Sequence, residues 1–301
     1  MIIEYLQPDA SIWDGLTVVN RAFYYAGTLS AAGIVLFTVA LGDRLDPYER
    51  GRLSRWLIGA VTIGLLFSLL AWPLRAIVLS KDGLEGALRF DLYPVMLRSP
   101  IGNAFLIRVV GLMLCLLAFV RRPWGLPLAA IGAVAVCASY VAMGHSTLYR
   151  PRQELATLIL LHLLAVAFWI GSLPALRIVA TRLEVVSAGE LMASYSRLAT
   201  WVVAGLVITG LLATWYLVGS VDLLLGSWHG WALITKTMLV AAMLGLGAWH
   251  KWRSTPDMLR GYRMSGEKIR RTITAEMILA LLVLYAAAEM VSVHAGGRLP
   301  D

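Results

Sequence analysis

Two histidines and a methionine flank the start of one hydrophobic run, and their side chains are typical metal ligands. Met143, Gly144, His145 and Ser146 form a short polar turn, and His162 follows inside the next apolar run. Imidazole and thioether groups close together, in a chain with few other polar side chains, suit a soft or borderline metal, Cu(I) before Zn(II). The pattern therefore predicts a copper site. Binding a metal ion needs no catalytic group, so we expect a binding protein and not an enzyme.

The helix that carries His162 sets the depth of this residue. His162 and Trp169 lie two helical turns apart and share one face of the helix. If the helix enters the bilayer near Glu154, a rise of about 1.5 Å per residue places His162 roughly 12 Å deep. An ionisable side chain at that depth marks a functional site by default, and a hydrogen bond to a neighbouring helix is the structural alternative.

Further candidate ligands lie near the same boundary, and each has a simpler interpretation. His229 stands beside Trp228 and close to Trp231, an arrangement typical of an anchor at the membrane interface. Met290 lies at the end of an apolar run, where methionine usually packs, and His294 lies in a glycine-containing tail. The predicted metal ligands are therefore His145, His162, Met143, His294, Met290 and His229.

The composition places these residues in a membrane protein. The chain is 59% hydrophobic, has a mean hydropathy of +0.75, and is only 15% charged, far below the roughly 25% of a soluble domain. Repeated apolar runs of about 20 residues predict an all-α polytopic membrane protein with eight transmembrane helices. The expected spans are Leu16–Leu41, Trp56–Leu79, Gly102–Val120, Trp124–Met143, Glu154–Leu176, Arg197–Val218, Trp231–His250 and Thr272–Val291.

Charge in the connections predicts the orientation of the helices. Lys and Arg are concentrated in alternate connections, above all in Lys251–Arg271, whereas Gly219–Gly230 carries none. Because basic connections stay on the cytoplasmic side, both termini are expected outside, together with His145, His229 and His294. These topology signals account for the net charge of +8, and no nucleic-acid partner is expected.

The two halves of the chain resemble each other. Gly102–Arg108 aligns with Gly230–Lys236, and each segment begins with Gly-X-Ala and ends in a basic residue. Residues 1–153 and 154–301 are therefore expected to form two four-helix halves in the same orientation, a parallel repeat. The first half has no counterpart of His162, so the deep histidine belongs to the second half alone. A cavity between the halves is the natural place for a site.

Several charged side chains also fall within the expected spans. The basic residues in the outer third of their spans are Arg21, Arg75, Arg108 and Lys236. The long side chains of most of them are expected to reach membrane lipid headgroups at the outer surface, whereas Lys236 is expected to form a structural ion pair, with Glu289 at a similar depth. Glu276 lies one turn inside the last span, and we expect it to form a structural ion pair with Arg270 or Arg271 of the basic loop.

Four motifs stand out along the chain. They are Gly-His145-Ser, His162-Leu-Leu-Ala with Trp169-Ile-Gly-Ser-Leu, Gly-Ser-Trp-His-Gly ahead of Lys236, and Arg-Arg-Thr ahead of Glu276. Together they resemble the CopD/PcoD family of copper-resistance membrane proteins, over nearly the whole chain. The resemblance implies an eight-helix protein of the bacterial inner (cytoplasmic) membrane, with periplasmic termini, that handles copper at its periplasmic face. Residue by residue, it singles out His145 and His162.

The chain departs from that family's pattern in two places. The family's first span often carries a histidine that is absent here, and Gly-His145-Ser replaces the commoner Gly-His-Ala. The chain also has no Met-rich or His-rich periplasmic extension. Capture of copper is therefore expected to depend on a separate soluble partner, a periplasmic copper chaperone.

Three functions are open at this point. In the first, copper docks at His145 and His162, enters the cavity between the halves and is transported toward the cytoplasm. In the second, two histidines bind a b-type haem and the chain is a membrane redox protein, although His145 lies in a turn and no second deep histidine faces His162. In the third, the chain is a scaffold that holds copper for cuproenzyme assembly and does not transport it.

Overall fold

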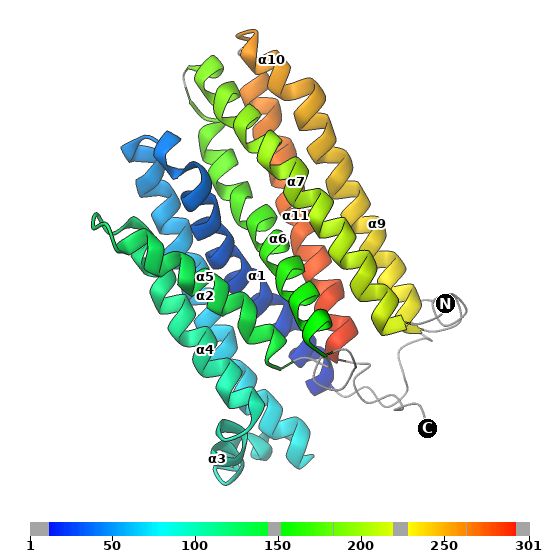
Figure 1. Ribbon diagram of the computed structural model, residues 1–301. Helices are drawn as coiled ribbons and strands as arrows, with labels where there is room; N and C mark the ends of the chain where they lie inside the picture. The colour runs from blue at the N-terminus through cyan, green and yellow to red at the C-terminus, as the bar shows by residue number, and fades with distance from the viewer. Residues whose placement is uncertain (1–11, 144–151, 183, 219–227, 263, 293–301) are drawn as a thin grey trace.

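All regular secondary structure in the described part of the chain is helical (Figure 1). The computed structural model describes residues 12–143, 152–182, 184–218, 228–262 and 264–292. The long helices are α1 (Ile12–Leu41), α2 (Pro47–Ser80), α4 (Pro100–Cys115), α5 (Gly125–Val141), α6 (Arg152–Val179), α7 (Val185–Val218), α9 (Trp228–Trp249) and α11 (Met264–Ser292). The short helical segments between them are η2 (Gly42–Arg44), η3 (Gly83–Leu88), α3 (Leu92–Leu97), η4 (Leu116–Phe119), η6 (His250–Ser254) and α10 (Thr255–Leu259). The all-α prediction is confirmed.

Within the described residues, seven helical segments are long and apolar enough to cross a membrane. The expected fourth span, Trp124–Met143, is the shorter apolar helix α5 of 17 residues. At about 1.5 Å per residue, α5 is roughly 26 Å long, near the lower limit for crossing a hydrocarbon core of about 30 Å. The multi-pass membrane character is confirmed, and the count of eight spans stays a prediction.

The long helices run alternately up and down in one bundle (Figure 1). Helix α1 contacts α2, α5, α6 and α11 and so occupies a central position. The first turn of α1 and the last turn of α11 lie at the same end of the bundle, here called the outer end, and α10 lies at the opposite, inner end. This arrangement agrees with the charge pattern, because α10 belongs to the most basic connection. Which end faces the cytoplasm stays a prediction.

Helices α1 and α6 approach closely at two glycines. A Cβ atom built on Gly33 would overlap the backbone of Ala167, and one built on Gly171 would overlap the backbone of Gly33. Small residues of this kind let two helix backbones meet. Fully buried Phe37 and Leu173 lie one turn or less beyond the crossing, so the first and second halves share one hydrophobic core.

An ion pair ties the two halves together at the inner end. Asp46 caps α2: its side chain accepts from the Glu49 backbone N–H at 2.8 Å, and Glu49 Oε2 accepts from the Asp46 backbone N–H at 3.1 Å. The two oxygens of Glu49 also accept from Arg182, each at 2.7 Å. The Glu49 carboxylate raises the pKa of the Arg182 guanidinium further above its ordinary value. This bidentate contact holds the loop after α6 against the first turn of α2.

Candidate functional site

Some of the predicted metal ligands are placed by the structure and others are not. His145 and His294 lie outside the described residues, and His229 lies in the first turn of α9 with its side chain outside the description. The predicted ligands that fall among the described residues are His162 in α6, Met143 just after α5, and Met290 near the end of α11. All three belong to the outer part of the bundle, because α5 and α11 end there and α6 begins there (Figure 1).

The His162 ring lies between α6 and α7. Its Nδ1 lies 3.3 Å from the backbone carbonyl oxygen of Leu206 and 3.4 Å from Oγ1 of Thr209. A Cβ atom on Gly210 would come within 3.2 Å of the ring carbon Cε1, so the glycine leaves room for the imidazole. Because a carbonyl oxygen can only accept, the bond to Leu206 favours the tautomer with its proton on Nδ1 and a lone pair on Nε2.

Met143 lines a different part of the molecule, a cavity of about 400 Å³ at the outer end of the first half, here called the outer cavity. Side chains from α1, α2, α4 and α5 form most of its wall. The Met143 sulfur accepts a long hydrogen bond of 3.8 Å from an Nη atom of Arg108. Met143 therefore contacts α4, whereas His162 contacts α7, and in this arrangement the structure does not bring these two predicted ligands together.

Arg108 does not reach the lipid headgroups, and the expectation that it does is wrong. Its side chain is only 4% exposed, and its Nε donates to Oγ of Ser139 at 3.2 Å. The guanidinium carbon lies 4.7 Å from the ring centroid of Tyr24 and 5.0 Å from that of Tyr140. Two aromatic faces attract the cation, so Arg108 is held inside the bundle between α1 and α5.

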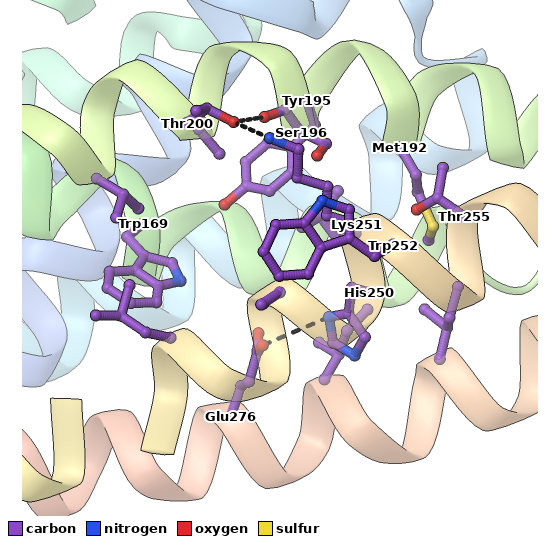
Figure 2. Close-up of a pocket in the computed structure, with 18 residues that line it drawn as sticks. Trp169, Met192, Tyr195, Ser196, Thr200, His250, Lys251, Trp252, Thr255 and Glu276 are labelled. Atoms are coloured by element: carbon purple, nitrogen blue, oxygen red, sulfur yellow. Dashed lines mark hydrogen bonds and ion pairs between the residues drawn. The ribbon is translucent and has the colours of Figure 1, made fainter. Parts of the chain in front are cut away.

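A second cavity, of about 220 Å³, lies toward the inner end of the second half and is here called the inner cavity (Figure 2). Side chains from α6, α7, α11 and the junction of α9 with η6 line it. Trp169 contributes from α6, two helical turns further along that helix than His162. On the α7 side, Lys251 donates to Oγ1 of Thr200 at 2.8 Å.

The polar pair His250 and Glu276 lies beside the inner cavity. His250 Nδ1 lies 3.4 Å from Glu276 Oε1, and His250 Nε2 lies 2.6 Å from Oγ1 of Thr272. The Glu276 side chain is 3% exposed, and its Oε1 forms no hydrogen bond with any described residue. A buried carboxylate beside an imidazole at this depth can hold a cation or a proton.

The expected ion pair of Glu276 with Arg270 or Arg271 is wrong. Both arginines donate instead to Oε1 of Glu267, at 3.0 Å and 3.1 Å. Glu267 is on the adjacent turn of the same helix, where such pairs form readily, whereas Glu276 lies deeper in the bundle. The signal in the sequence for the true partner is His250, which ends the expected span Trp231–His250 just before the basic connection Lys251–Arg271.

Within the described ranges, no group of three or more His, Cys, Asp or Glu side chains is arranged to hold a metal ion. The predicted copper ligands extend beyond those ranges and include methionine. The site of His162 and Met143 with His145 and His294 therefore stays a prediction. Among the described residues, the inner cavity is the place where an imidazole and a buried carboxylate meet.

Comparison with known families gives two matches along the chain. A family model described as Copper resistance protein D matches residues 189–290. A second model, described as Copper resistance protein D-like, N-terminal domain, matches residues 11–150. No curated protein and no solved structure matches the chain. The first match includes His250 and Glu276, and the second includes the whole wall of the outer cavity apart from Val291.

Proposed function

The chain belongs to the copper resistance protein D family, and from this premise we propose that it binds copper at its outer face and transports it toward the cytoplasm. In this proposal Cu(I) first meets His145 and Met143, then binds His162, and then passes along the interface of α6 and α7 to the inner cavity. Copper is the transported ion, and no bond is made or broken in a substrate.

The hydrogen bond of the His162 ring is the observation that carries the proposal. Its Nδ1 faces the Leu206 carbonyl oxygen at 3.3 Å, so Nε2 keeps the lone pair that a metal needs. Histidines that bind metals almost always donate their other ring N–H to a carbonyl, a carboxylate or water. The same bond also suits a histidine that only ties α6 to α7, so a measurement has to separate the two roles.

The positions of His162 and Trp169 support a route inward. Trp169 lies on the same face of α6 roughly 10 Å further along the helix, and it lines the inner cavity with His250 and Glu276. A cation that leaves His162 toward the inner end therefore finds an imidazole and a carboxylate next. Between the two levels, Leu206 belongs to the hydrophobic core, and Ala165 and Val166 pack against it. Passage therefore requires α6 and α7 to shift relative to each other.

The haem alternative finds no support among the described histidines. His162 lies roughly 15 Å along α6 from the outer end, whereas His250 follows the 22 residues of α9 and lies roughly 33 Å from that end. Two axial ligands of one haem have to face each other across a single ring. His162 and His250 are at different levels of the bundle and do not form such a pair.

Copper binding by ligand variants tests the proposal. We expect His162→Leu to bind Cu(I) roughly tenfold more weakly or worse than the wild type, and His162→Met, which keeps a soft ligand, to recover most of the affinity. Thr209→Val is the control for packing, because it alters the surroundings of the ring and leaves the imidazole in place. Competition with a Cu(I)-binding dye measures the affinity, and an optical spectrum of the same sample reports any haem.

Transport and scaffolding differ in what happens after binding. Purified protein in sealed proteoliposomes is supplied with Cu(I) outside, and the copper that enters the lumen is measured over time. Entry that depends on His162 supports transport. Tight binding without entry assigns the protein to scaffolding, and Cu(I) binding by His162→Leu equal to that of the wild type returns His162 to a structural role.

A further inference from the structure

We propose that the outer cavity binds a phosphate group, supplied by the headgroup of an anionic phospholipid or by inorganic phosphate. The cavity measures about 400 Å³, and Arg21, Arg75 and Arg108 all line it. It belongs to the first half of the chain, apart from His162 and from the inner cavity. The proposal goes beyond copper handling and does not rest on it.

The lining of the outer cavity carries more positive than negative charge. Three guanidinium groups line the outer cavity, those of Arg21, Arg75 and Arg108. Asp14 supplies the one carboxylate among the described lining residues, and it takes part in an interaction of its own. Arg21 and Arg75 lie near enough for their charges to act on each other. Even with Asp14 counted, the cavity has more cations than anions, and its buried groups are poorly screened by water. The guanidinium groups therefore repel one another, and a bound anion would offset that repulsion.

Buried polar atoms without partners point to the same ligand. Arg21 Nη1 and the Ser68 hydroxyl are buried and form no hydrogen bond with any described residue, and both residues line the outer cavity. Ser68 is 2% exposed. Such orphaned groups are rare and each needs an explanation. Asn20 Oδ1, an unpartnered acceptor in the same cavity, suits a hydroxyl of phosphatidylglycerol or of hydrogen phosphate.

Arg108 is held in position by neutral groups. The rings of Tyr24 and Tyr140 and the hydroxyl of Ser139 fix its guanidinium, yet none of them supplies a negative charge. A fixed guanidinium presents its N–H donors in a plane that matches the oxygens of a phosphate. The same charge repels a metal cation. The charge of the outer cavity therefore favours an anion, and it weakens any contact of copper with Met143, which also lines the cavity.

Binding measurements on the full chain in detergent test this assignment. Native mass spectrometry follows phosphatidylglycerol, with phosphatidylcholine as the lipid of zero net headgroup charge, and calorimetry follows inorganic phosphate. We expect Arg21→Gln and Arg75→Gln each to weaken binding of the phosphate group roughly tenfold or more, because each variant loses a charge-assisted hydrogen bond to it. Arg98→Gln is the matched control, because Arg98 is exposed at the same end and does not line the cavity.

The outcomes separate the two sources of phosphate. Preferential binding of phosphatidylglycerol without binding of inorganic phosphate identifies a lipid headgroup, and binding of inorganic phosphate identifies a soluble anion. Binding of neither by the wild type, or equal binding by the wild type and both cavity variants, overturns the proposal. Cu(I) affinity of Arg21→Gln and Arg75→Gln is not expected to fall, because neither residue is a predicted copper ligand, so failure of this proposal and failure of the proposed function are distinguishable.

Discussion

The carboxylate oxygen Oε1 of Glu276 lies 3.4 Å from Nδ1 of His250, at the wall of the inner cavity (Figure 2). The helix changes from α-helical to π-helical geometry at His250, and such turns are frequent at functional sites. The two residues come from different helices, α11 and the end of α9. Their meeting makes this pair the place to test whether copper leaves through the inner cavity.

We expect Glu276→Gln to slow Cu(I) uptake into proteoliposomes roughly tenfold, because an amide, unlike a carboxyl group, cannot release a proton and become an anionic ligand for the cation. The Cu(I) affinity at the outer face is expected to stay unchanged, since His162 lies at another level of the bundle. Glu267→Gln is the control, because Glu267 pairs with Arg270 and Arg271 at the start of α11. Uptake by Glu276→Gln at the wild-type rate would remove the inner cavity from the route.

Met143→Leu is expected to weaken Cu(I) binding by a factor of roughly three or less, a smaller effect than that of His162→Leu. The Met143 sulfur contacts the Arg108 guanidinium, and that cation opposes copper at the same atom. Met113→Leu is the control, because Met113 is an exposed methionine on α4. Equal losses in Met143→Leu and His162→Leu would show that the two residues bind the same ion despite their separation in this structure.

Arg182→Ala is expected to lower the free energy of unfolding by about 3 kcal/mol, because it leaves the buried Glu49 carboxylate without its cation. Arg197→Ala is the control; Arg197 is exposed and donates to Ser194, and we expect a change of about 0.5 kcal/mol or less. Thermal unfolding in detergent measures both. A matching loss in Glu49→Gln, without a further loss in the double variant, would confirm that one contact is responsible.

The contribution of Arg182 is expected to persist as the pH is raised. Its pKa is raised above the ordinary value of the guanidinium by the hydrogen bonds to Glu49. When folding raises the pKa of a basic group, the group stabilises the folded state at every pH below its pKa in the unfolded chain. This stabilisation is lost only as the pH rises through the group's pKa in the folded chain. The difference between wild type and Arg182→Ala should therefore stay constant from about pH 7 up to about pH 10. A difference that shrinks within this range would contradict the assignment.

Gly171→Ala is expected to reduce the yield of folded protein and to cost about 3 kcal/mol, because the new methyl group overlaps the backbone of Gly33. Gly205→Ala is the matched control on α7, where a Cβ atom meets nothing within 4 Å. Alanine is the better helix former, so Gly205→Ala should gain up to about 1 kcal/mol. Fluorescence-detected size exclusion after heating compares the two, and equal melting temperatures would contradict the close crossing of α1 and α6.

The helices were predictable because apolar runs mark the parts of the chain that lie in hydrocarbon. Their starts were predicted less well: α2 begins at Pro47 and not near Trp56, and α7 begins at Val185 and not near Arg197. An apolar run marks only the part of a helix inside the bilayer core, so it does not include the polar turns that extend the helix beyond that core. For α2 the local signal was present, since Asp46 and Glu49 form a capping box around Pro47.

The sites were less predictable than the helices. His162 was found from its depth. Its contact with Leu206 of α7 is the hydrogen bond that the structural alternative expects, so its ligand role stays a prediction. Two contacts depend on which helix faces pack against each other. They are the pair of His250 with Glu276 and the stacking of Tyr24 and Tyr140 on the Arg108 guanidinium. The spacing of apolar residues predicts which face of a helix is buried, but not which other helix packs against that face. These contacts therefore could not be predicted from the sequence.

The contact between Arg182 and Glu49 also bears on the order in which the chain is made. Glu49 is synthesised early, and its cation follows 133 residues later, after α6 has been synthesised. Until then the first turn of α2 holds an uncompensated carboxylate, and α1 exposes the Gly33 surface that α6 later covers. The first half therefore cannot complete its folding until the second half has been synthesised. If the two halves are expressed from separate genes, we expect the fragments to accumulate only when they are coexpressed.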